Sequence, residues 1–151
     1  FHADHGNLAA AGTALSVTSL SFARTALRKQ KGPAGELLAI EPFALVVPAE
    51  LETIAQQLIA QLMATKTSDV NPFAGELEII VEPGLTSSTA WYLIGNPTMY
   101  EGLTWVTLDG MDTPRVESRA GWNTLGMEFR VTWALDAAFT ETATWYRNPG
   151  A

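Results

Sequence analysis

The sequence predicts an α+β fold, and three stretches carry that prediction. Residues 43–47 read FALVV, an unbroken apolar run typical of a strand covered on both faces. Pro48 ends this strand, and residues 51–62 then place apolar side chains three and four positions apart, as in a helix that packs back onto a sheet. Residues 127–133 alternate between apolar and polar, which indicates a strand with one solvent-facing side. A βαβ-like first half followed by an antiparallel second half is the α+β pattern.

The elements follow in order along the chain. Residues 1–15 are small, rich in Gly and Ala and weakly patterned, so we expect a flexible N-terminal arm. A helix should begin between residues 16 and 19, where Ser and Thr can cap its amides, and end at Gly32 and Pro33. Its inner face comprises Leu20, Ala23 and Leu27. The apolar stripe of the second helix comprises Leu51, Ile54, Ala55, Leu58, Ile59 and Leu62. Further strands are expected at residues 37–40, 76–82, 90–95, 103–108 and 142–147.

Size and composition narrow the class of protein. The chain has 151 residues, 47% of them hydrophobic and 17% charged, which is typical of one globular domain. The net charge of −7 argues against a surface that binds nucleic acid through its phosphates. No apolar run approaches the ~20 residues of a membrane helix, so we expect no membrane partner. The chain has no cysteine and does not begin with Met, and we expect it to be a piece of a longer product.

Few residues suggest chemistry. His2, Asp4 and His5 could contribute to a metal site, but a structural site needs a further fixed ligand, and an incidental polar arm is the favoured interpretation. The sequence contains no motif for a nucleophile elbow, a phosphate-binding loop or a zinc protease. Two sets of carboxylates have ordinary roles. Glu76, Glu78 and Glu82 form a solvated strand face, and Asp109 and Asp112 form local hydrogen bonds in a turn.

Aromatic and basic residues leave two interpretations open. Trp91, Trp105 and Trp133 lie in expected strands and are assigned to the core, whereas Trp122 and Trp145 could anchor an interface. Four basic residues gather within positions 24–31 at the end of the first helix. They either complement the helix dipole on a solvated face, which is favoured, or form a contact patch for an acidic neighbour. We therefore expect no catalytic, cofactor-binding or metal-binding residue, no cofactor, and a structural or binding role.

A series of segments, in order along nearly the whole chain, resembles the major capsid proteins of tailed phages and prophages. The closest resemblance is to the Mu-like major head subunit, which is sometimes encoded fused behind a prohead protease. The segments are HGNL (5–8), SLSFARTALRKQKG (19–32), FALVVPAELE (43–52), DVNPFAGELEIIVEP (69–83), AWYLIGNP (90–97), VESRAGW (116–122), GMEFRVTW (126–133) and YRNPGA (146–151). The specificity lies in the series and not in a single motif.

The resemblance implies a Hong Kong 97-type (HK97-like) capsid fold. Residues 16–151 would form the axial domain, a sheet flanked by helices, in which residues from about 16 to 100 supply most of the structure. Antiparallel strands of the peripheral domain, at about 103–135, would be inserted before the last strand. The family's N-terminal arm, extended loop and spine helix would lie upstream, so the chain would be a C-terminal fragment.

The implied function is structural and not enzymatic. Copies would assemble into hexamers and pentamers of a shell that encloses DNA, in the phage head and, during assembly, in the bacterial cytoplasm. Partners would be other copies of the chain, with scaffold or prohead protease in addition and no specific nucleic-acid binding. Candidate contacts are residues 66–75, near the capsomer axis, and residues 24–31, where charge reversal at Arg28 and Lys29 should impair assembly. The alternatives are an uncharacterised α+β enzyme or another small phage interaction module.

Overall fold

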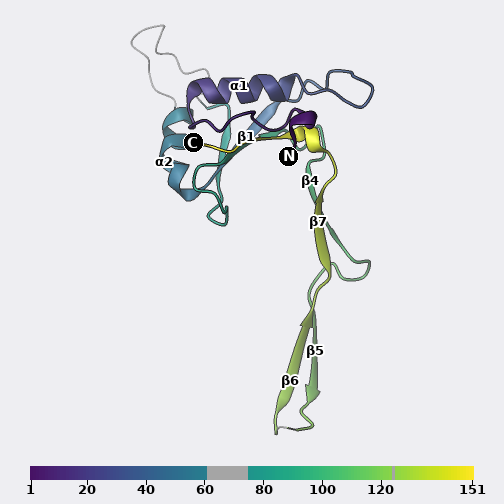
Figure 1. Cartoon of the computed structure of the whole chain (residues 1–151). Helices are drawn as coiled ribbons and strands as arrows, with labels where there is room; N and C mark the ends of the chain where they lie inside the picture. Colours follow the sequence, from purple (N-terminus) through teal and green to yellow (C-terminus); the bar gives the residue numbers. More distant parts are fainter. Residues whose placement is uncertain (61–74, 124) are drawn as a thin grey trace. The chain divides into compact units, whose positions relative to one another are not determined.

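The structure is a computed structural model, and it describes residues 1–60, 75–123 and 125–151. Helices and several sheets occur together in it, so the expected α+β class is confirmed. The chain forms two compact units (Figure 1). The first unit comprises Phe1–Gly102 and Glu141–Ala151, and the second comprises Leu103–Thr140. The second unit is therefore an insertion before the last strand, and the names axial and peripheral domain remain predictions.

A four-stranded sheet forms the centre of the first unit. Its strands are β1 (Pro42–Val47), β2 (Glu78–Val81), β3 (Trp91–Gly95) and β8 (Trp145–Asn148), in the order β2-β1-β3-β8. β1 runs parallel to β2 and antiparallel to β3, and β8 is antiparallel to β3. The last four residues of β1 are buried, which confirms the strand predicted from its apolar run. Because successive side chains of a strand point to opposite faces, burial of all four means that β1 is covered on both faces.

Helix α1 (Val17–Arg28) begins and packs as predicted, but it ends at Arg28 and not at Gly32 and Pro33. The Ser16 side chain accepts a hydrogen bond from the Ser19 backbone amide, and the Ser19 hydroxyl accepts one from the Ser16 amide, so the two residues form a capping box. The inner-face residues Leu20, Ala23 and Leu27 are fully buried. They share one core with residues of the sheet, and Figure 1 shows α1 lying along β1.

Helix α2 (Glu52–Ile59) follows β1 after Pro48 and a single 3-10 turn, Ala49–Leu51. It belongs to the crossover that a parallel β1–β2 pair requires. Ala55 and Ile59 are buried as predicted, but Ile54 is 41% exposed and lies outside the buried stripe. Leu62, the last residue of the predicted stripe, lies outside the described residues.

The core lies on one face of the sheet. Leu45 of β1 stands opposite Leu93 of β3, and Leu93 stands opposite Tyr146 of β8, so the three side chains share a face. All three are buried and belong to the same cluster as the inner residues of α1. Burial also raises the pKa of the Tyr146 phenol. The hydrophobic interior therefore forms between this face and the helices.

The segment at residues 1–15 pairs with the last strand. The Ala9 amide donates to the Arg147 carbonyl and the Arg147 amide donates to the Asn7 carbonyl, both at 2.9 Å. Asn7 is buried, and its Nδ2 donates to the Thr142 carbonyl at 2.9 Å. The flexibility expected for residues 1–15 remains a prediction.

Three local predictions were wrong. Residues 37–40 form no strand beyond an isolated bridge at Leu37, because Ala39 has a positive φ of 52° that breaks the extended backbone. Residues Thr142–Thr144 form a 3-10 turn, so the last strand begins only at Trp145. Strand β7 (Leu135–Phe139) was not predicted. Its sequence, LDAAF, lacks the β-branched residues that mark most strands.

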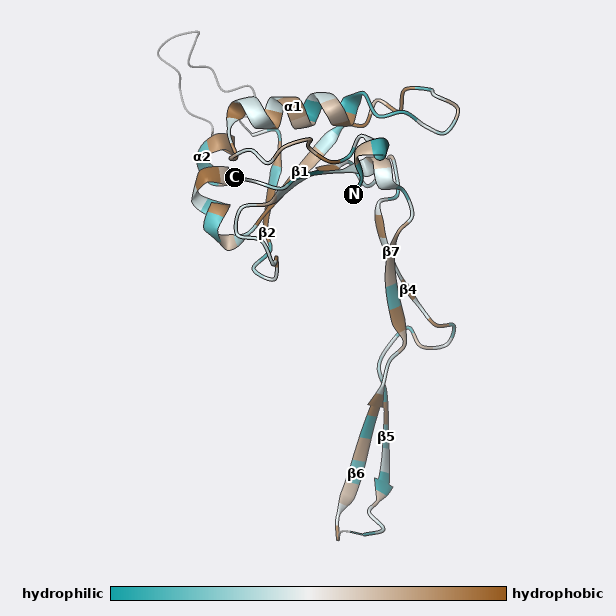
Figure 2. Ribbon diagram, viewed as in Figure 1, coloured by the Kyte–Doolittle hydropathy of each residue, from teal (hydrophilic) through white to brown (hydrophobic). Residues whose placement is uncertain are grey.

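The second unit consists of two antiparallel ribbons. β4 (Leu103–Thr107) pairs with β7, and β5 (Arg115–Ala120) pairs with β6 (Met127–Thr132). Apolar and polar residues alternate along β6, as Figure 2 shows, whereas β7 has one polar residue, Asp136. A two-stranded ribbon has no second layer of its own, so its apolar side chains have little to pack against.

Replacing Leu45 by Ala should lower the free energy of unfolding by about 2–5 kcal/mol, because the change removes buried methyl groups and leaves a cavity. Urea unfolding followed by circular dichroism measures this loss. Phe22→Ala on α1 is the control: Phe22 is 71% exposed, so its loss should stay within about 0.5 kcal/mol. Equal losses for the two variants would contradict the assignment of the core to the Leu45 face.

Candidate interaction surface

The ribbon formed by β5 and β6 has two chemically opposite faces. Directly opposed residues of an antiparallel pair share a face, and residues alternate between faces along each strand. One face, here called the apolar face, comprises Val116, Ser118, Ala120, Met127, Phe129 and Val131. The other, here called the charged face, comprises Arg115, Glu117, Arg119, Glu128, Arg130 and Thr132. The register therefore separates nearly all charge from nearly all apolar surface.

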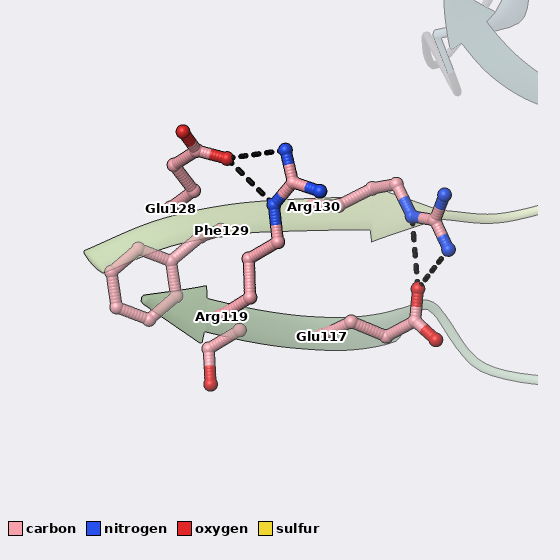
Figure 3. A pocket seen from close by; sticks show the side chains of 6 residues that line it. Glu117, Arg119, Glu128, Phe129 and Arg130 are labelled. Atoms are coloured by element: carbon pink, nitrogen blue, oxygen red, sulfur yellow. Dashed lines mark hydrogen bonds and ion pairs between the residues drawn. The ribbon is translucent and has the colours of Figure 1, made fainter. Parts of the chain in front are cut away.

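The charged face is held together by ion pairs across the strands (Figure 3). Nε and a terminal nitrogen of Arg119 both lie 2.7 Å from Oε2 of Glu128. Nε of Arg130 donates to Oε2 of Glu117 at 2.9 Å, and a terminal nitrogen of Arg130 contacts the same oxygen. Arg115 lies 3.0 Å from Oε1 of Glu117. The Arg115–Glu117 pair lies within β5, whereas the Arg119–Glu128 and Arg130–Glu117 pairs join the two strands. These two cross-strand pairs favour one register, because a shift by one residue would separate them.

Glu117 pairs with two arginines of this face, Arg115 and Arg130. The hydrogen bond from Arg130, and then the charge of Arg115, hold the pKa of Glu117 below its ordinary value of 4.5. A hollow of about 430 Å³ lies beside these pairs and is lined by Glu117, Ser118, Arg119, Glu128, Phe129 and Arg130. Its arginines are already matched by carboxylates, so the hollow offers no spare charge to a ligand.

The apolar face is open to solvent. Val116 is 65% exposed, Phe129 72%, Val131 66% and Met127 58%. The sequence analysis predicted one wet face on this strand, and the charged face confirms it. The expectation that the opposite side is covered was wrong within the described residues. Exposed apolar residues gathered on one face are typical of interaction sites.

The ribbon formed by β4 and β7 is similar in character. Leu103 stands opposite Phe139, and Trp105 stands opposite Ala137 on the same face. Leu103 is 54% exposed and Trp105 is 64% exposed. Exposed apolar side chains are therefore spread over both ribbons of the second unit.

The tryptophans divide between the units. Trp91 is fully buried, as predicted. The assignment of Trp105 and Trp133 to the core was wrong, because Trp105 is 64% exposed and Trp133 is 44% exposed. Both lie in the second unit, whose described residues provide no second layer to cover them. Trp133 instead donates from Nε1 to the Met111 carbonyl at 3.0 Å. Trp122 is 97% exposed and Trp145 is partly buried, and their role as interface anchors remains a prediction.

The polar candidates from the sequence are local in their contacts. His2 lies 3.3 Å from Asp4, and the His2 and His5 rings are 6.0 Å apart. Within the described ranges, no three His, Asp or Glu side chains come close enough together to hold a metal ion. Asp112 accepts a hydrogen bond from the Thr107 hydroxyl at 2.9 Å in the predicted turn. The predicted solvated face is confirmed, because its three carboxylates are all exposed, namely Glu76, Glu78 and Glu82.

The basic end of α1 has partners within the chain. Arg24 lies 3.9 Å from Glu76, and Arg28 lies 3.7 Å from Glu41. The other predicted contact, residues 66–75, lies outside the described residues except for Gly75. No helix that the structure describes is long and apolar enough to cross a bilayer.

The half of the apolar face that β5 contributes was not predicted. No strand was expected at residues 116–119, which are short and charged, yet Arg115, Glu117 and Arg119 alternate with smaller or apolar residues. A turn containing Gly121 and Gly126 then joins this run to the alternating run of β6. Two alternating runs joined by a Gly-containing turn indicate a hairpin, and that signal could have found the ribbon.

Lowering the pH should weaken the Glu117 pairs. Because the pKa of Glu117 is depressed in the folded state, its contribution to stability is present above the ordinary pKa and is lost as the pH falls through the depressed value. A carbon-13 NMR titration of the carboxyl group should therefore give a midpoint below 4.5. In Arg130→Gln the midpoint should move up. An unchanged midpoint in that variant would contradict the assigned cause.

Comparison with known proteins adds a family. A family model described as phage capsid protein matches residues 2–148. No curated protein matches the chain. A solved structure, the satellite phage P4 procapsid including size determination (Sid) protein, is similar with a TM-score of 0.47 and 15% sequence identity. The match covers 87% of this chain and 38% of that chain, so the present chain spans well under half of the similar protein. Because the family model spans nearly the whole sequence, the chain belongs to the phage capsid protein family.

Proposed function

We propose that the chain is part of the major head protein of a tailed bacteriophage or prophage, and that its copies assemble into the hexamers and pentamers of an icosahedral shell enclosing DNA. The observation that carries the proposal is the family match over residues 2–148. The fold is proposed to be of the Hong Kong 97 type, with the Mu-like major head subunit as its nearest variety. The first unit is then the axial domain and the second unit belongs to the peripheral domain.

The apolar face of the β5–β6 ribbon supports an assembling protein. An amphipathic sheet is stable only when its apolar side is buried against something, and the described residues supply no cover. The strongly polar opposite face makes insertion of the whole ribbon into a core costly, because the ion-paired side chains would lose their water. The ribbon thus suits one-sided burial at an interface between copies.

Contacts around a symmetry axis are head-to-tail, so two different patches on each copy must match. The apolar face is one proposed patch, and residues 66–75 near the capsomer axis are another. Further proposed partners are a scaffold and a prohead protease. The proposed locations are the phage head and, during assembly, the bacterial cytoplasm. The net charge of −7 suits a shell wall that must not bind the packed DNA.

The proposal predicts a face-specific effect of charge on assembly. Val131→Glu, which places a carboxylate on the apolar face, should abolish shells or reduce them to small oligomers, because burial of the charge is costly. Thr132→Glu is the matched control: it adds the same side chain one position along, on the charged face opposite Arg115. Negative-stain electron microscopy of the protein expressed from its complete gene measures the outcome.

Closed shells or rings from the unaltered protein, and from Thr132→Glu, would support the proposal. Uniform small monomers from the unaltered protein would contradict the capsid role and favour an enzyme or a small interaction module. Normal shells from Val131→Glu would contradict the role proposed for the apolar face but not the capsid role. Circular dichroism of both variants checks that the strands still form.

A further inference from the structure

Strand β6 has one backbone edge, here called the open edge, with which no described strand pairs. The strand forms a two-stranded sheet with β5, which uses only its other edge. Its sequence, MEFRVT, contains no proline, and its pairing with β5 has no bulge, so two common protections of a sheet edge are missing. Its residues from Met127 to Val131 are exposed. The open edge is therefore accessible to a further strand.

The register shows which backbone groups lie on the open edge. The Gly121 amide donates to the Gly126 carbonyl at 2.8 Å, so these two residues form a hydrogen-bonded pair in line with the ladder. Hydrogen-bonded and non-hydrogen-bonded pairs alternate along an antiparallel ladder. The even-numbered residues of β6 therefore direct their backbone groups toward β5. The backbone groups of Met127, Phe129 and Val131 point away from β5, along the open edge.

The side chains of β6 match those of a second β6 strand laid antiparallel beside it. With Phe129 opposite Phe129 of the second copy, the outward backbone groups of the two strands face each other, and each such pair can exchange two hydrogen bonds. Met127 then stands opposite Val131 on the apolar face. Glu128 stands opposite Arg130 on the charged face. Aromatic pairs and opposite charges at directly opposed positions stabilise a sheet.

Other alignments of the two strands are unfavourable. Sliding one strand by two residues sets either Glu128 opposite Glu128 or Arg130 opposite Arg130, and like charges directly opposite are destabilising. Sliding it by one residue sets Phe129 opposite Glu128, so apolar and charged side chains share a face and the outward backbone groups no longer meet. A parallel in-register pair places each charge beside its own kind. Charge and backbone geometry therefore select the same alignment.

The ion pairs within the ribbon leave atoms for this contact. Two nitrogens of Arg119 contact Oε2 of Glu128, and no described residue contacts Oε1 of Glu128 (Figure 3). Arg130 contacts Glu117 through Nε and one terminal nitrogen, and its other terminal nitrogen has no partner among the described residues. Across two ribbons joined at β6, one row of side chains would read Arg119, Glu128, Arg130, Glu117. The sign of the charge would alternate along the whole row.

The outer edge of β5 offers a weaker version of the same pattern. Its outward residues are Val116, Ser118 and Ala120, and antiparallel pairing about Ser118 would set Glu117 opposite Arg119. Small side chains give a cross-strand pair less surface to bury than the aromatic and long side chains of β6. The observations therefore favour the open edge of β6, and pairing through β5 is an outcome that the experiment separates.

From this alignment we propose that the open edge of β6 pairs with the same edge of a second copy of the chain. The two ribbons would form one antiparallel sheet in the order β5-β6-β6-β5, about a twofold axis between the two Phe129 residues. A twofold contact is isologous, so one edge serves both copies, unlike the head-to-tail contacts proposed for the capsomers. The inference does not rest on the capsid role, because it needs only two copies of the chain.

Disulfide trapping in the 151-residue chain tests the alignment. The chain has no cysteine, so one introduced cysteine reports one position. Phe129→Cys should give a disulfide-linked dimer in a glutathione redox buffer, because position 129 meets itself across the axis. Met127→Cys and Val131→Cys should not do so alone, since identical positions then lie about 13 Å apart along the strand, beyond the ~7 Å that a disulfide spans. Mixing these two variants should restore the dimer. Non-reducing electrophoresis measures the yields.

Two results of the trapping would overturn the proposal. A dimer from Ser118→Cys and none from Phe129→Cys would assign the contact to the β5 edge. Equal yields from single cysteines at positions 127, 129 and 131 would reveal random collision and not a fixed alignment.

Charge exchange tests the pairing without a covalent link. Glu128→Arg and Arg130→Glu each set like charges opposite one another twice in the dimer, so each should weaken dimerisation at least about tenfold. An equimolar mixture of the two should dimerise again, because each introduced charge then meets its opposite on the other chain. Arg115→Gln is the matched control: it removes a charge from the same face, but Arg115 has no opposed charge in the second copy. Sedimentation velocity at several concentrations measures the association.

Dimers of the unaltered chain and of Arg115→Gln, with rescue in the mixture, would support the proposal. Damage to the ribbon itself would persist in the mixture, so rescue separates pairing from folding. A monomeric unaltered chain at every concentration, or a mixture as weak as its components, would overturn the proposal. Neither experiment involves shells, so its failure is distinguishable from failure of the capsid proposal.

Discussion

The burial of β1 is the constraint on which the first unit depends. The strand has a neighbour on each side, so its backbone groups are paired. Its last four residues are buried, so both of its faces are covered. Its parallel pairing with β2 requires a crossover, to which α2 contributes, and its antiparallel pairing with β3 brings Leu45 and Leu93 together. The last strand, β8, completes this sheet only after the chain has left it for the insertion. The sheet therefore contains the strands that precede and follow the inserted second unit, residues 103–140.

The second unit is governed by different physics. It has no buried core in the described residues, and its β5–β6 register is favoured by ion pairs such as Glu117–Arg130 and by main-chain pairing. Exposed ion pairs contribute little stability each, and they are screened by salt. They do, however, keep charge on one face and so leave an apolar face on the other. A unit whose apolar residues lie on the surface and not in a core is suited to contact with other molecules, which agrees with membership of a capsid family.

The two proposed surfaces differ in the interaction that they use. The apolar face would gain from removal of surface from water, a contribution that is non-directional and insensitive to moderate salt. The open edge of β6 would gain from directed main-chain hydrogen bonds and from opposite charges in one alignment, so it would supply specificity more than bulk affinity. Contact surfaces that combine an apolar part with a polar, directional part can both hold copies together and select the correct neighbour.

Local sequence patterns predicted the faces of three elements. These features are the apolar run of β1, the cap and inner face of α1, and the alternation of β6. Each depends only on residues close together in the sequence. Whether a face would be covered was decided only by tertiary structure. Trp105 and Phe129 have the same local pattern as core residues, and they are exposed because the described residues of the second unit provide no second layer on their ribbons. The positive φ of Ala39 and the open edge of β6 likewise arise from what surrounds them, which no periodicity encodes.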